Sequence, residues 1–119
     1  MMEKLHRVVI TGLGAITPIG NDLESYLKGL QSGQNGVDQI TLFDASSHAC
    51  RFAAEVKSFD PTGKLEPKES KRWDRFSKFG VIAAKEALNH SGLIIANSNS
   101  GRIGVIIGSG VGGVLTMET

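Results

Sequence analysis

The sequence is poor in cysteine, proline and aromatic residues, and it carries no strong charge of either sign. Its 119 residues include one cysteine, three prolines and 6% aromatic residues, and the formal net charge is +1. The single cysteine, Cys50, excludes an internal disulfide, which fits a reducing compartment. The small net charge creates no global field that attracts nucleic acid or a membrane surface, so we expect neither as a partner.

Long hydrophobic runs are also missing. No stretch reaches the roughly 18 apolar residues that a membrane span needs. The N-terminal MMEKLHRVVITG lacks the long apolar core and cleavage site of a secretory signal. We therefore expect a cytoplasmic protein, or one of the plastid stroma if the source is a plant. Three histidines and one cysteine, scattered without metal-ligand spacing, predict no metal, and we expect no other cofactor.

Glycine, by contrast, is abundant, with 15 residues. Its clusters at 12–14, 29–36 and 101–113 predict turns between regular elements. The last cluster ends the stretch IGVIIGSGVGG with the spacing Gly-x-Gly-x-x-Gly, the formal fingerprint of a dinucleotide site. The acidic ribose ligand of such a site would fall about 20 positions later, beyond Thr119. A tight strand-to-helix turn is the simpler interpretation, and the nucleotide site stays an alternative.

Apolar patterning predicts strands and helices that alternate along the chain. The predicted strands are Leu5–Thr11, buried on both faces, Arg51–Val56 and Arg102–Ile107; the predicted helices are residues 22–33, Pro67–Ser91 and a helix opening at Val114; residues 34–49 are predicted to be mostly loop. This alternation indicates a layered α/β architecture. Because three strands and an opening helix leave a parallel sheet incomplete, we expect the first part of a larger unit.

Capping residues predict where the helices begin and end. Asn21 is expected to cap the first helix, with Glu24 three residues later completing a capping-box pair. Pro67 suits the first position of the long helix, and Gly92 is expected to end it.

Basic residues gather at the start of the predicted long helix. Lys68, Lys71, Arg72 and Arg75 are spaced i, i+3, i+4 and i+7, which places them on one face, and Lys78 extends it. Cations near a helix N-terminus oppose the macrodipole, so local stability does not explain them. Taken alone, the pattern indicates a solvated charged face.

Five stretches, read in order, resemble the β-ketoacyl-acyl-carrier-protein synthases, most closely the synthase II type of fatty acid elongation. They are RVVITGLGAITPIGN, GVDQITLFDAS, FAAEVKSFDP, KESKRWDRFSKFGVIAAKEAL and RIGVIIGSGVGG, which together span nearly the whole chain. The resemblance implies a thiolase-like α/β fold, of which residues 1–119 form the first part of the N-terminal half. It also implies a homodimer and the decarboxylative condensation of an acyl thioester with malonyl-acyl-carrier-protein.

The resemblance assigns roles to two groups of residues. Gly110, Val111 and Gly112 match the turn beside the acyl pocket, where Val111 takes the place of a larger gating residue. Lys68, Lys71 and Arg72 match the surface on which related synthases dock the acidic acyl carrier protein, and complementary charge speeds such an encounter.

The resemblance also implies that the nucleophilic cysteine and both catalytic histidines lie beyond this region, so we expect no catalytic residue here and no activity from the chain alone. Cys50 and His48 form a conceivable pair, but they precede a strand in a loop, and we expect an inert thiol. His90, near a helix C-terminus, is expected to be structural. Two alternatives stay open: a non-catalytic partner subunit of the chain-length-factor kind, and the dinucleotide-binding domain.

Overall fold

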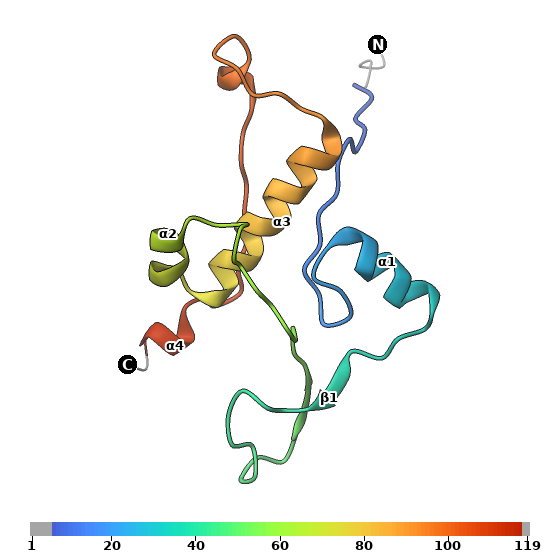
Figure 1. The fold of residues 1–119 in the computed structure, drawn as a ribbon, viewed down its shortest axis with the longest axis vertical. Helices are drawn as coiled ribbons and strands as arrows, with labels where there is room; N and C mark the ends of the chain where they lie inside the picture. Colours follow the sequence, from blue (N-terminus) through green and yellow to red (C-terminus); the bar gives the residue numbers. More distant parts are fainter. Residues whose placement is uncertain (1–5, 118–119) are drawn as a thin grey trace, which may run out of the picture.

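The structure is a computed structural model that describes residues 6–117. Within this range lie α1 (Leu23–Gln31), β1 (Val37–Gln39), β2 (Phe52–Ala54), α2 (Pro67–Arg72), α3 (Arg75–Ser91), the 3₁₀-helix η1 (Ser100–Arg102) and α4 (Val114–Met117). Figure 1 shows α3 in the middle of the molecule, with the chain before α1 along one side and the segment leading to α4 along the other. The β1–β2 hairpin projects away from these helices (Figure 1).

Helix α1 lies within the predicted range, but its capping residue is one position later than predicted. Asp22 is the capping residue, and its carboxylate accepts a 2.7 Å hydrogen bond from the Ser25 backbone N–H. This bond holds the pKa of Asp22 below its usual value, because it stabilises the charged carboxylate. The Asn21 side chain instead donates to the carbonyl oxygens of Lys57 and Ser58. The predicted Asn21 cap is therefore wrong.

The second half of the predicted capping box is also absent. The Glu24 carboxylate lies 2.6 Å from Lys28 Nζ, one turn along the same helix. Both side chains are exposed, so water screens this pair and it adds little to helix stability.

The two strands form an antiparallel pair in which Val37 lies opposite Ala54. Strand β2 confirms the middle of the predicted strand Arg51–Val56, whereas β1 lies in a region predicted to be loop. The β1 sequence, VDQ, has one β-branched residue and no alternating pattern, so it gives little strand signal.

Polar side-chain contacts stabilise this hairpin. Lys57 Nζ lies 2.7 Å from Asp38 Oδ2. The Glu55 carboxylate accepts bonds from both the hydroxyl and the backbone N–H of Thr41. These bonds, led by the hydroxyl, hold the pKa of Glu55 below its usual value.

The predicted helix Pro67–Ser91 is two helices. Trp73 and Asp74 separate α2 from α3 with extended backbone, at ψ 140° and 158°. Asp has low helix propensity, and the Asp74 carboxylate bonds to the Thr116 hydroxyl of α4. The predicted end at Gly92 is confirmed, since this residue caps α3 with φ +65°.

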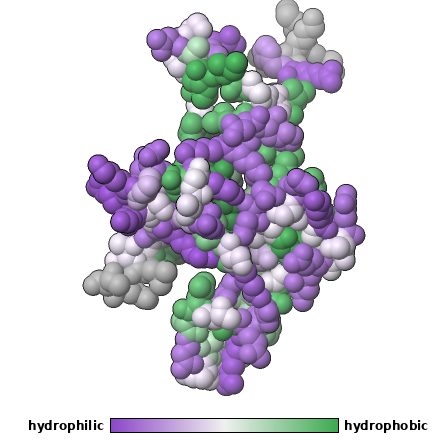
Figure 2. All heavy atoms as spheres, viewed as in Figure 1, coloured by the Kyte–Doolittle hydropathy of each residue, from purple (hydrophilic) through white to green (hydrophobic). Residues whose placement is uncertain are grey.

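The first and third predicted strands are extended but unpaired among residues 6–117. Leu5 lies outside the described residues, and the rest of that segment is exposed, as Val8 is at 87%. In the segment 103–107, Ile106 is 100% exposed. The predicted parallel sheet is therefore not formed here, because such strands need neighbours and covering helices on both faces. Figure 2 shows the resulting apolar surface in green around the upper part of the molecule.

The glycines of the first cluster allow the chain to cross α3 at very short range. A β-carbon on Gly12 would lie 2.1 Å from the Ala87 carbonyl oxygen, and one on Gly14 would lie 2.0 Å from that of Ala83. No side chain fits at either position, because real β-carbons do not approach an oxygen this closely. Small residues on both surfaces thus bring two backbones into contact.

Glu86 and His90 secure this crossing with hydrogen bonds. The two oxygens of the Glu86 carboxylate accept from the backbone N–H groups of Ala15 and Leu23, at 2.8 and 2.7 Å. One turn later, His90 Nδ1 accepts from the Leu13 N–H at 3.0 Å. The expected structural role of His90 is therefore confirmed, and it comes from this hydrogen bond.

This contact predicts that Gly14→Ala destabilises the protein by about 1–3 kcal/mol, the usual cost of overpacking. The measurement is the urea unfolding midpoint. Gly101→Ala is the matched control, because a β-carbon there meets nothing within 4 Å. Equal midpoints for the two variants would contradict the close crossing.

Candidate functional site

The glycine turn that ends IGVIIGSGVGG lies against the start of α3. Gly112 and Gly113 both have φ +61°, a conformation that other residues rarely adopt. A β-carbon on Gly112 would lie 3.0 Å from the Phe76 ring, and one on Gly113 would lie 3.0 Å from Asp74 Oδ2. A β-carbon on Gly110, in contrast, would meet nothing within 4 Å. Close approach within the described chain thus requires glycine at 112 and 113 but not at 110.

Among the cavities that border this turn, two are lined by both Gly112 and Gly113. One, of about 410 Å³, lies between the turn, the start of α3 and the hairpin, and its wall includes Leu42, Phe76 and Phe79. The other, of about 470 Å³, is lined by Val111 together with Asp74 and Phe76. Val111 is 77% exposed, so it borders this open space and is not part of a packed core. The turn therefore presents an aliphatic side chain to a mainly apolar hollow.

The dinucleotide alternative fits this geometry poorly. The Asp74 carboxylate lies beside Gly113, the last glycine of the fingerprint, so a pyrophosphate bound to these glycines would meet a negative charge. Two groups of like charge at such a distance repel each other. Helix α4 begins directly after the turn, as predicted, although the last two residues of the predicted segment lie outside the described range.

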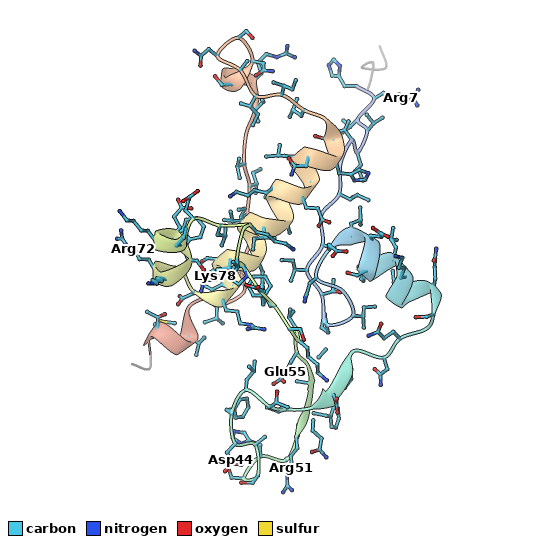
Figure 3. The ribbon with its side chains drawn as sticks, viewed as in Figure 1. Arg7, Asp44, Arg51, Glu55, Arg72 and Lys78 are labelled. Carbon is cyan, nitrogen blue, oxygen red and sulfur yellow. The ribbon has the colours of Figure 1, made fainter. Side chains whose placement is uncertain are left out.

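Helix α2 exposes the three predicted docking residues. Lys68, Lys71 and Arg72 are all exposed, and none of their side chains has a hydrogen bond or ion pair within residues 6–117. Figure 3 shows Arg72 on the outer side of α2, pointing away from α3. These cations are therefore available to a partner.

The predicted five-cation face is wrong, because the break at Trp73–Asp74 interrupts the helical spacing. Arg75 turns inward: its guanidinium donates to the Val56 carbonyl oxygen and lies 5.1 Å from the centre of the Phe79 ring. It also lies over Phe59, whose ring packs edge-on against Phe79. Arg75 thus anchors the segment after β2 to α3, and of the predicted basic face only the three cations on α2 are exposed.

Cys50 and His48 are not brought together. Cys50 is exposed, and its sulfur lies 3.5 Å from the Phe52 carbonyl oxygen. The His48 ring packs edge-on against Phe43, and its Nδ1 lies 3.4 Å from the Ser47 hydroxyl. No metal-binding cluster occurs among the described residues, and none of their helices is long and apolar enough to span a membrane.

The polar residues that hold these parts together were not predicted from the sequence. Glu86 was not singled out, although a carboxylate between Ala83 and Ala87 on the small-residue stripe of a helix is a detectable signal. The partners of Asp74 and Arg75 gave no such signal, because they lie 42 and 19 residues away in the chain.

Comparison with known proteins now identifies the family. A family model described as "Beta-ketoacyl synthase, N-terminal domain" matches residues 5–119. The chain belongs to the β-ketoacyl synthase family. Relatives named 3-oxoacyl-[acyl-carrier-protein] synthase 2 include those of Synechocystis, 55% identical over 94% of this chain, and of Vibrio harveyi, 45% identical over 94%. The Staphylococcus aureus relative is 42% identical over 98% of the chain.

These relatives are much longer than the chain, which covers 27% or 28% of their lengths. Among solved structures, "The ishigamide ketosynthase/chain length factor" matches 72% of this chain and 21% of its own, with a TM-score of 0.60 and 33% identity. The predicted thiolase-like ketosynthase fold class is thereby confirmed. The β-ketoacyl synthase segment described here contains helices and one small strand pair, which is part of such a domain.

Proposed function

We propose that this chain is the N-terminal segment of a 3-oxoacyl-acyl-carrier-protein synthase of fatty acid elongation. The observation that carries the proposal is the 42–55% identity to relatives of that name over nearly the whole chain. Such an enzyme joins an enzyme-bound acyl group to malonyl-acyl-carrier-protein, and carbon dioxide leaves as the new carbon–carbon bond forms. The remaining part of the polypeptide supplies the cysteine nucleophile and the two histidines that assist this step.

Two exposed apolar segments support the proposal that this chain is part of a larger enzyme. Residues 6–11 and 103–107 have strand-like sequences and mostly exposed side chains, as expected of strands whose neighbours belong to the rest of the synthase. The isolated chain is accordingly inactive. We also propose, on the family resemblance, that the complete synthase is a cytoplasmic homodimer.

The direct test uses a complete synthase, defined here as the Synechocystis relative with its matching segment replaced by this chain. We expect it to condense acyl and malonyl groups carried by acyl carrier protein, whereas the 119-residue chain alone does not. The measurement is the rate of carbon dioxide release. An inactive but folded complete synthase, beside an active Synechocystis parent, would contradict the proposal.

Within this enzyme, Gly110, Val111 and Gly112 form part of the acyl-pocket wall. Val111 lines the 470 Å³ cavity, and Gly112 packs on Phe76 with a backbone that only glycine adopts easily. Burial of each methylene group of an acyl chain contributes about 0.8 kcal/mol to binding. The size of residue 111 sets how many methylene groups the pocket can bury, and it therefore affects which chains fit.

Helix α2 is the docking surface for acyl carrier protein in this proposal. Its three exposed cations, which have no partner among residues 6–117, suit an acidic carrier, because opposite charges steer the encounter and fix its orientation. Docking at α2 places the carrier next to the start of α3, which contacts the glycine turn.

Charge reversal tests the docking assignment. In the complete synthase, changing Lys68, Lys71 and Arg72 to Glu is expected to raise the apparent KM for acyl carrier protein severalfold at low salt, with a smaller effect at high salt. The matched control reverses Lys28, Arg51 and Arg102, three exposed cations outside α2. Equal effects of the two triple variants, or an effect independent of salt, would contradict docking at α2.

One observation favours a second candidate, a non-catalytic chain-length-factor subunit. The solved relative is named as a ketosynthase together with a chain length factor. The two kinds of subunit differ in the catalytic cysteine, which this candidate lacks. The names of the curated relatives favour the synthase.

A further inference from the structure

The junction between α2 and α3 contacts the glycine turn through Asp74. Although Asp74 occupies the N-cap position of α3, its side chain makes no capping hydrogen bond there. Its Oδ1 accepts from the Thr116 hydroxyl of α4, and its Oδ2 lies beside Gly113. A hydrogen bond to a charged carboxylate is stronger than one between neutral groups. Asp74 therefore ties the helix that follows the turn to the helix that precedes it.

Phe76 completes this support from the same end of α3. Its ring packs on Gly112, next to the side chain that faces the proposed acyl pocket. Asp74 and Phe76 line both of the cavities that include Gly112 and Gly113. The place of Val111 at the cavity edge is thus set by contacts with these two residues.

Within residues 6–117, much of the turn borders open space. β-Carbons on Gly108 and Gly110 would meet nothing within 4 Å. The backbone bonds from Thr116 and Met117 to the Gly113 carbonyl oxygen are local to α4 and do not reach another element. Glycines cost more conformational entropy to order than other residues, so an external tie is needed to hold this segment in one place.

We propose that Asp74 is a positioning residue that determines acyl chain-length discrimination, by holding the Val111 turn through Thr116. The inference rests on the proposed function, since it concerns the same acyl pocket. With the bond in place, Val111 stays at one position on the cavity wall and excludes chains beyond a certain length. Without it, the turn moves away from α3 and admits long and short chains more equally.

The test compares kcat/KM for a short and a long saturated acyl chain on acyl carrier protein, in the complete synthase. Thr116→Val and Asp74→Ala, which remove the donor and the acceptor, are each expected to bring the ratio of the two values about threefold to tenfold closer to one. Thr116→Ser and Asp74→Asn, which keep a donor and an acceptor, should restore most of the discrimination. The double variant Asp74→Ala/Thr116→Val should lose no more than either single variant.

Two further variants make the outcomes distinct. Asp44→Ala is the matched control, because this exposed carboxylate accepts a 2.9 Å bond from the Ser46 N–H in the loop at the far end of the hairpin (Figure 3). It should leave the ratio unchanged. Val111→Phe should shift the ratio toward the short chain, because a larger side chain fills part of the pocket.

If Val111→Phe leaves the ratio unchanged, the pocket assignment in the proposed function is wrong. If Val111→Phe shifts the ratio but Thr116→Val does not, the pocket stands and the role of Asp74 is overturned. An equal loss of rate for both chain lengths in Thr116→Val also overturns it, since a general structural defect does not discriminate between substrates. Thr116→Val changes one hydroxyl only, so it decides the question even if Asp74→Ala fails to fold.

Discussion

The contact between the Gly12–Gly14 segment and α3 is the constraint on which the rest of the structure depends. Two backbones meet there at a distance that no side chain permits, and Glu86 then closes the contact with two hydrogen bonds. One of these bonds reaches the first residue of α1, so the same carboxylate links the crossing segment, α1 and α3. Glu86 thereby ties the crossing segment and the start of α1 to the same helix.

The opposite end of α3 organises the proposed function. Its first residues support the glycine turn through Phe76 and Asp74, while Arg75 holds the segment after the hairpin. The break before α3 turns α2 outward, so that its cations face solvent while the turn faces the cavities (Figures 1 and 3). The short junction between α2 and α3 thus separates the proposed docking surface on α2 from the proposed pocket wall.

Features that depend on neighbouring residues could be predicted from the sequence. The course of α1, the Gly92 end of α3 and the opening of α4 follow from local periodicity and capping, and the five motifs indicated the family. The break at Trp73–Asp74 could not be predicted, because the Asp74 partner is Thr116, on another element. Segments 6–11 and 103–107 have strand composition, but pairing requires partners that composition does not specify. The roles of Val111 and of the α2 cations come from resemblance and stay predictions.

Through Glu86, α3 holds residues 15–23 in place. Amide hydrogen exchange in Glu86→Gln tests this role, because a carboxamide has one acceptor oxygen where the carboxylate has two. We predict faster exchange at Ala15 or Leu23, with Gly20, whose N–H bonds to the Thr17 carbonyl oxygen, as the internal reference. Unchanged exchange at both Ala15 and Leu23 would show that Glu86 does not hold this segment.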